Sequence, residues 1–94
     1  MAYIIEPRNE FRRQYRRLQF AGRPRVITKL KNIIRQLANG EVLPQSARNH
    51  KLSGIFAGYE ECHVEPDWLL IYKIEKEKLI LVLVATGTHD QLFN

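Results

Sequence analysis

The chain has 94 residues, of which 45% are hydrophobic and 27% are charged, and its formal net charge is +5. A chain of this length has apolar residues for one modest core, so we expect a single domain over residues 1–94. The hydrophobic fraction excludes a disordered tail, and no apolar run reaches the roughly 18 to 20 residues of a membrane-spanning helix. The N-terminus lacks the charged and apolar regions of a secretory signal, which predicts a cytoplasmic protein.

The positive charge is concentrated in the first half of the chain. Residues 8–51 contain twelve Lys or Arg and two acids, Glu10 and Glu41, so this segment alone carries about +10. Residues 52–94 contain three lysines against seven acids. Such a surface attracts the phosphates of a nucleic acid or an acidic protein partner. Arginines that merely solvate helix faces are the alternative, but solvation alone does not require such a shortage of acids.

The chain opens with a predicted strand and a predicted helix. Tyr3–Ile5 has the composition of a short strand, which Pro7 ends because proline cannot donate to a ladder. Asn9 is a candidate N-cap for a helix that reaches about Phe20, with apolar residues spaced i, i+4, i+7. Gly22 breaks this helix.

A second helix follows at once. Pro24 stands where a first helical turn tolerates proline, and apolar residues then recur at helical period until Asn39-Gly40. The two helices are predicted to form a hairpin. The segment from Glu41 to Gly58 has no period and is predicted to be a long loop.

Three strands complete the prediction. The runs Tyr59–Glu65, Trp68–Glu75 and Lys78–Thr86 are separated by short polar turns and predict a meander. The last two are apolar at alternate positions of both faces, so we expect them inside a covered sheet, with the helical hairpin on one face. Residues Thr88–Phe93 add a short C-terminal turn or helix. The order β-α-α-β-β-β predicts an α+β domain.

The polar residues that packing does not explain lie at the ends of these elements. They fall in the segments Asn49–Leu52, Cys62–Trp68 and Thr86–His89, and in the terminal Phe93. Each of the three segments contains one of the chain's three histidines, His50, His63 and His89. Histidine is the side chain best suited to proton transfer at neutral pH, which predicts a catalytic site.

The run HVEPDWLLIYK from His63 to Lys73, with TGTH at Thr86–His89 and a loop at residues 50–54, resembles the YafQ branch of the RelE/ParE superfamily. Element order and length agree with that family over nearly the whole chain. The resemblance implies a curved antiparallel sheet packed on a helical hairpin. It also implies the toxin of a type II toxin–antitoxin system, a metal-independent endoribonuclease that needs no cofactor and cleaves mRNA in the ribosomal A site.

The same resemblance implies partners. These are mRNA on the ribosome and a cognate antitoxin of ribbon-helix-helix type, whose acidic C-terminal segment would complement the basic first helix. The toxin–antitoxin complex is expected to be a higher oligomer, and no membrane is involved.

Carried over to this sequence, the resemblance implies a cleft formed by His50, His63, Asp67, Trp68, His89 and Phe93. The chain departs from the family at one point, because the YafQ pattern has an arginine immediately before TGTH and Ala85 stands there. Such an arginine would hold the scissile phosphate. Arg48, Lys51 or a protonated histidine is expected to replace it, and the sequence does not choose among them.

The chemistry suits these residue types. RNA cleavage without a metal needs a base for the 2′-hydroxyl, positive charge beside the phosphorane and an acid for the departing 5′-oxygen. We predict that His50, with Asp67, acts as the base or orients it. His89 is the predicted acid, and His63 supplies charge or positions the phosphate.

Structural explanations exist for several of these residues. Trp68 and Phe93 are predicted to stack an unpaired base, although a Trp that begins an apolar strand is more often part of a core. Asp67 after Pro66 also suits a tight turn. His63 within a strand is equally explained as a half-exposed cross-strand partner.

A metal site and a cysteine nucleophile are less favoured by the spacing. Cys62 and His63 are consecutive in a strand, so they point to opposite faces, and the sequence has no CxxC or HxxxH pair. We therefore predict no metal, and we expect Cys62 in the core.

Two other functions compete with the ribonuclease. The first is a catalytically weak or inactive module that binds RNA or a partner, because Ala85 has replaced the arginine. The second is a regulator that binds duplex DNA through its basic helices, but it lacks a recognition-helix motif and leaves the histidines without a role.

Overall fold

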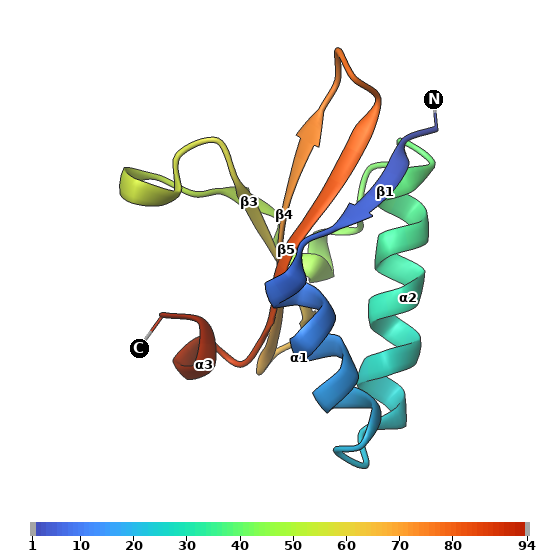
Figure 1. Ribbon diagram of the computed structural model, residues 1–94, viewed down its shortest axis with the longest axis vertical. Coiled ribbons are helices and arrows are strands. Elements are labelled where there is room, and N and C mark those ends of the chain that lie inside the picture. Colours follow the sequence, from blue (N-terminus) through green and yellow to red (C-terminus); the bar gives the residue numbers. More distant parts are fainter. Residues whose placement is uncertain (1, 94) are drawn as a thin grey trace.

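A computed structural model describes residues 2–93, in which two helices pack on one face of a five-stranded sheet (Figure 1). The strands are β1 (Ile4–Pro7), β2 (His50–Lys51), β3 (Glu60–Glu65), β4 (Trp68–Glu75) and β5 (Ile80–Gly87). The helices are α1 (Asn9–Gln19), α2 (Pro24–Ala38) and α3 (His89–Phe93), with 3₁₀ turns η1 (Gln45–Ala47) and η2 (Gly54–Phe56). The α+β class and the element order are confirmed, with β2 added inside the segment expected to be a loop. Met1 and Asn94, the ends of the expected domain, lie outside the described residues.

The sheet is mixed, whereas a wholly antiparallel sheet was expected. Strands β3, β4 and β5 form the predicted antiparallel meander, and the order across the sheet is β1-β5-β4-β3-β2. Strand β1 runs parallel to β5, with Ile4 opposite Ile80 and Pro7 opposite Leu83. Parallel neighbours need a long connection, and here it contains both helices and the rest of the sheet. The expectation that every strand of the sheet is antiparallel to its neighbours was therefore wrong for β1.

Helices α1 and α2 bury the apolar residues that recur at helical spacing. Phe11 and Leu18 of α1 and Leu30 of α2 are at most 5% exposed. The predicted N-cap was wrong by one residue, because Arg8 is the N-cap of α1 and Asn9 is already its first helical residue. No side chain caps this end of α1, so packing of its apolar face, and not a cap, holds the helix in place.

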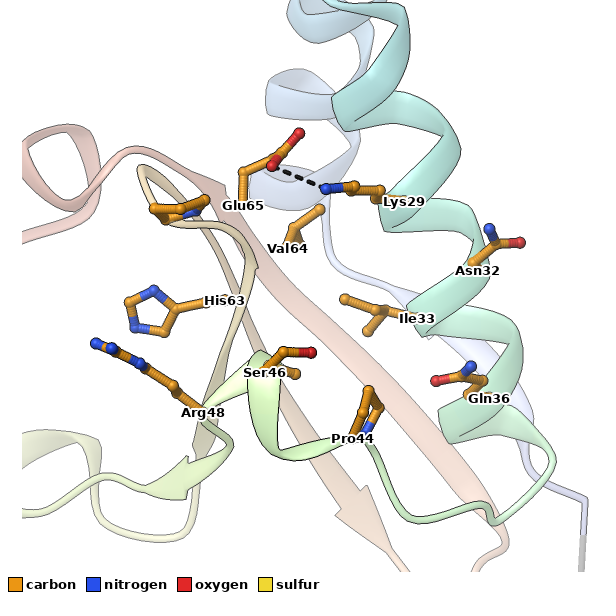
Figure 2. Close-up of a pocket in the computed structure, with 12 residues that line it drawn as sticks. Lys29, Asn32, Ile33, Gln36, Pro44, Ser46, Arg48, His63, Val64 and Glu65 are labelled. Atoms are coloured by element: carbon orange, nitrogen blue, oxygen red, sulfur yellow. Dashed lines mark hydrogen bonds and ion pairs between the residues drawn. The ribbon is translucent and has the colours of Figure 1, made fainter.

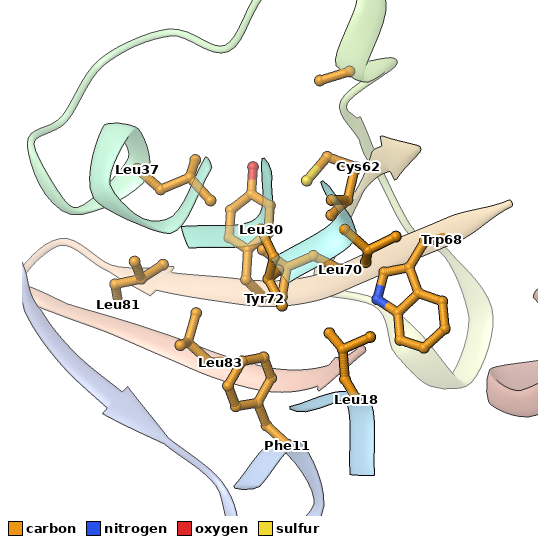
Figure 3. Close-up of a cluster of buried hydrophobic side chains, with 13 residues drawn as sticks. Phe11, Leu18, Leu30, Leu37, Cys62, Trp68, Leu70, Tyr72, Leu81 and Leu83 are labelled. Atoms are coloured by element: carbon orange, nitrogen blue, oxygen red, sulfur yellow. The ribbon is translucent and has the colours of Figure 1, made fainter. Parts of the chain in front are cut away.

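The main core lies between these helices and the sheet (Figure 3). Leu70 and Tyr72 of β4 and Leu81 and Leu83 of β5 contribute from the sheet. Residues 68–72 of β4 are buried whichever face they occupy, which confirms that this strand is covered on both sides. Within residues 2–93, no helix has the length and hydrophobicity needed to cross a bilayer.

Candidate active site

The face of the sheet turned away from α1 and α2, here called the open face, carries two polar residues of β3. Side chains alternate along a strand. Because Cys62 is fully buried in the helix-side core, its neighbours Glu61 and His63 belong to the open face. The prediction that Cys62 is a core residue is confirmed.

Strand pairing extends this face into two rows. The first row contains His50, Glu61, Ile71 and Ala85, each paired with the next. The second contains His63, Leu69 and Gly87, with His89 two residues farther along the chain. Neighbouring strands lie about 4.8 Å apart, so the backbones of His63 and Gly87 are separated by roughly 10 Å. The register therefore brings His50 and His63 to one face of the sheet, and β5 ends beside them two residues before His89.

His50 is held through both ring nitrogens. Its Nδ1 lies 3.0 Å from the backbone carbonyl oxygen of Arg48, and its Nε2 lies 3.3 Å from Oε1 of Glu61. Both partners are oxygen atoms, so one hydrogen-bond contact and one ion-pair contact orient the ring. Glu61 is 6% exposed and so forms a buried carboxylate beside a half-exposed ring. Asp67 forms no ion pair or hydrogen bond with His50.

The backbone before His50 is fixed by local contacts. Arg48 has a positive φ of 47°, which turns the chain out of η1. The side-chain amide of Asn49 donates to Glu60 and accepts a hydrogen bond from the hydroxyl of Tyr72. These contacts align His50–Lys51 with β3, so the expected loop forms a short strand here.

Arg48 and His63 line the same recess of ≈ 580 Å³, beside the part of β3 that β2 does not cover. Figure 2 shows both side chains extending away from α2. Lys51 follows His50 in β2, and alternation turns its side chain from the open face. Arg48 and Lys51 were the two cations expected to replace the missing arginine. Of these, Arg48 is the one that shares a recess with His63.

His89 is the first residue of α3, and aromatic contacts connect it to η2. The centroid of its ring lies 5.0 Å from that of Phe93, which lies 5.7 Å from that of Phe56. Thr88 and Gln91 exchange hydrogen bonds between side chain and backbone at the start of α3, as in a capping box. The T-x-x-Q spacing is a signal in the sequence for a helix that begins at His89.

The segment before His89 is immobilised from two sides. The backbone N–H of Thr86 donates to Gln14 of α1 at 2.7 Å, and its hydroxyl donates to the carbonyl oxygen of Leu69 at 2.8 Å. A Cβ at Gly87 would lie 2.8 Å from Oε1 of Gln91, so glycine lets α3 fold back closely over the strand end. This packing fixes where His89 emerges.

Asp67 and Trp68 lie apart from the open face. One Nη of Arg23 contacts both carboxylate oxygens of Asp67, at 3.0 and 3.2 Å, and the guanidinium carbon lies 5.0 Å from the centroid of the Trp68 ring. Trp68 is 7% exposed, and its Nε1 donates to the hydroxyl of Thr86 at 2.8 Å. A ring that is 7% exposed and lies beneath a guanidinium offers little surface on which a base could stack. Both residues are thus placed to anchor β4 beside the TGTH segment.

Two residues of this site were missed from the sequence. Glu61 precedes His63 by two positions in a strand, so it shares its face, and that spacing was the available signal. Arg23 offered no signal, because its partner is 44 residues away in the chain.

Burial, together with the carboxylates of Glu61 and Glu60, raises the pKa of the Cys62 thiol to about 12. The thiol is therefore no nucleophile at neutral pH. Across residues 2–93, no group of three His, Cys, Asp or Glu side chains is placed to hold a metal ion.

The burial of Cys62 predicts slow thiol chemistry. We expect the native protein to react with a chromogenic disulfide at pH 8 roughly a hundredfold more slowly than the protein in guanidinium chloride, because attack requires local opening. Absorbance against time measures both rates. Equal rates in the two conditions would contradict the buried position.

Comparison with known proteins agrees with this fold. The family model described as the bacterial toxin of a type II toxin–antitoxin system, YafQ, matches residues 3–94. The mRNA interferase toxin YafQ of Escherichia coli K12 is 42% identical over 72 residues, which cover 76% of each chain. The crystal structure of the E. coli DinJ–YafQ complex superposes with a TM-score of 0.87 at 34% identity, covering 98% of this chain and 99% of that one.

A crystal structure of a metal-bound toxin from Helicobacter pylori superposes with a TM-score of 0.88 at 32% identity, covering 99% of this chain and 100% of that one. The family match spans nearly the whole sequence, and the E. coli relative supports it independently. The chain therefore belongs to the YafQ family of bacterial type II toxin–antitoxin toxins.

Proposed function

We propose that this toxin is an endoribonuclease that cuts messenger RNA by acid–base chemistry on the open face, without a metal. The observation that carries the proposal is the register that brings His50 and His63 to one face and the TGTH segment to its edge. The name of the E. coli relative, mRNA interferase toxin, supports the substrate class.

The hydrogen bonds favour a division of roles among the histidines. Both ring nitrogens of His50 are engaged, whereas the rings of His63 and His89 have no hydrogen-bond partner among the described residues. His63 is the proposed base, which removes the proton of the 2′-hydroxyl as that oxygen attacks phosphorus. His89 is the proposed acid, which protonates the 5′-oxygen as its bond to phosphorus breaks. The products are a 2′,3′-cyclic phosphate and a 5′-hydroxyl.

The remaining residues stabilise and position the substrate. The guanidinium of Arg48 supplies positive charge to the phosphorane, as does the ring of His50 when it is protonated, and Glu61 positions His50. Phe93, partly exposed beside His89, is the proposed stacking surface for an unpaired base. Asp67 and Trp68 are proposed to stabilise the fold and not to touch the substrate, because Asp67 pairs with Arg23 and Trp68 donates a hydrogen bond to Thr86.

The proposal also includes the setting of the reaction. We infer that it takes place in the ribosomal A site of the cytoplasm, and that a ribbon-helix-helix antitoxin with an acidic segment inhibits the toxin in a higher-order complex. The solved E. coli toxin–antitoxin complex supports an antitoxin as partner.

Primer extension on messages after brief induction tests the activity. Discrete new 5′ ends are expected with the wild-type toxin and none with a His63→Ala/His89→Ala variant. Growth arrest without new 5′ ends would instead favour the inactive binding module that Ala85 allows.

Arg48 is expected to carry the role of the missing arginine. Arg48→Gln should lower the cleavage rate roughly 100-fold, the usual effect of losing one donor to a developing oxyanion, because Arg48 lines the same recess as His63. Lys51→Gln is the matched control, with the same loss of charge on the opposite strand face, and should change the rate less than about threefold. Single-turnover rates on programmed ribosomes measure both. Equal losses would show that the position of the charge does not matter.

Metal independence is tested at the scissile phosphate, because ribosomes themselves require Mg²⁺. Replacing a non-bridging phosphate oxygen by sulfur should slow cleavage, and added Mn²⁺ or Cd²⁺ should not restore the rate. Rescue by a thiophilic ion would show that a metal contacts this oxygen, and the metal-free mechanism would be abandoned.

A further inference from the structure

The solvent side of α1 carries a cluster of exposed arginines that the proposed chemistry does not use. Arg12, Arg13, Arg16 and Arg17, here called the α1 arginine face, lie opposite the buried Phe11 and Leu18. Within the described part of the chain, an ion pair reaches one of the four, since Glu10 contacts Arg13. The other three present their guanidinium groups to solvent.

The sequence of α1 makes this face unfavourable for the isolated helix. Arg12 and Arg16 are spaced i, i+4, and so are Arg13 and Arg17, and like charges at this spacing destabilise a helix. A helix that needs only solvation places acids between its bases. The α1 arginine face therefore suits a polyanionic ligand that would offset the repulsion.

The α1 arginine face lies close to the TGTH segment, Thr86–His89. The end of β5 lies between α1 and α3 (Figure 1), and the backbone N–H of Thr86 donates a hydrogen bond to the side chain of Gln14 in α1. A recess of ≈ 330 Å³ at this junction is lined by Arg17 on the α1 side and by Thr88 and Gln91 on the other. Thr88 directly precedes His89. An RNA strand that leaves the open face at His89 through this recess would pass Arg17 and Arg23.

The far end of α1 adds a feature of single-strand recognition. Phe20, the C-cap residue of α1, is 86% exposed. An exposed ring beside guanidinium groups is the arrangement on which unpaired bases stack while cations contact the backbone. Arginine forks also match the oxygens of phosphate groups in pairs.

We propose that the α1 arginine face binds the phosphodiester backbone of RNA outside the catalytic cleft. The proposal rests on the proposed function, because it takes the ligand of the cleft to be RNA. The backbone belongs either to the message that continues past the cleft or to ribosomal RNA beside it, and both present the same chemistry. An acidic peptide segment is the competing ligand of another class.

The test compares two double variants of the full chain that lose the same charge. Arg16→Gln/Arg17→Gln removes two cations from the α1 arginine face, and Lys31→Gln/Arg35→Gln removes two exposed cations from α2. A fluorescent 2′-O-methyl oligonucleotide, which keeps its phosphates and cannot be cut, reports binding by anisotropy between 50 and 300 mM salt. Glutamine preserves helix propensity, and melting curves check the fold of both proteins.

We expect the α1 variant to reduce the slope of log affinity against log salt by about 1.4, since each phosphate contact on a single strand contributes about 0.7. At about 0.1 M salt this corresponds to a roughly 20-fold loss of affinity. The α2 variant should change affinity less than about threefold. A loss on the oligonucleotide identifies the message as the source, and a loss confined to binding of 70S ribosomes identifies ribosomal RNA.

Other results overturn the proposal. Equal losses in the two variants would mean that net charge alone acts. Unchanged RNA and ribosome binding, with weaker binding of a synthetic acidic peptide, would assign the face to a protein. The nuclease proposal can fail independently of this one. If the wild-type toxin cuts no RNA but its binding still shows the salt slope that depends on α1, the nuclease proposal is wrong and the RNA-binding role of the α1 arginine face stands.

Discussion

Replacing His89 by Ala should lower the rate of message cleavage roughly 10³-fold, within the range that general acid catalysis contributes. The ring of His89 also touches Phe93, so the Ala variant loses a contact of α3 as well as a proton donor. His89→Gln is the better probe, because it keeps a side chain of similar length at the start of α3. We expect Gln and Ala to lose the same activity, since neither transfers a proton.

The pH dependence separates His89 from His63. An acid must be protonated to act, so its loss removes the alkaline limb of the pH–rate profile, whereas loss of the base removes the acidic limb. We expect His89→Gln to lose the former and His63→Gln the latter. A substrate with sulfur in place of the 5′-oxygen needs no protonation of its leaving group and should restore cleavage by His89→Gln. Continued slow cleavage of that substrate would remove His89 from the role of acid.

Replacing Trp68 by Ala should destabilise the fold by about 3 to 5 kcal/mol, the usual result of deleting a buried Trp. A domain of this size has only about 5 to 15 kcal/mol of stability, and its melting temperature should fall by more than about 12 °C. Trp68→Phe keeps most of the packing and loses the hydrogen bond to Thr86, which should cost about 1 kcal/mol. Thermal melts followed by circular dichroism measure both.

The two variants also test whether Trp68 touches the substrate. Because the ring is 7% exposed and Arg23 lies over it, we expect the folded Trp68→Phe protein to cut with unchanged KM. A Trp68→Ala protein as stable as the wild type but weaker in RNA binding would show that the ring stacks a base, as the family resemblance had implied.

Much of the fold was predictable because each element has a strong local pattern. The apolar period of α2 and its boundaries at Pro24 and Asn39-Gly40 are explicit in the sequence, as is the continuous apolar run of β4. The parallel pairing of β1 was not predictable. The sequence of a four-residue strand indicates which of its faces are apolar. It does not indicate which strand it pairs with, or whether the pairing is parallel or antiparallel.

The candidate site divides in the same way. The sequence by itself determined that the three histidines lie in segments typical of one toxin family, and that Cys62 and His63 face opposite ways; His63 lies inside β3 and not, as had been expected, at an element end. Only the tertiary structure decided that Glu61 pairs with His50 and that Arg23 holds Asp67. Alternation along a strand sets the direction of a side chain, whereas its partner depends on register and packing between segments far apart in the chain.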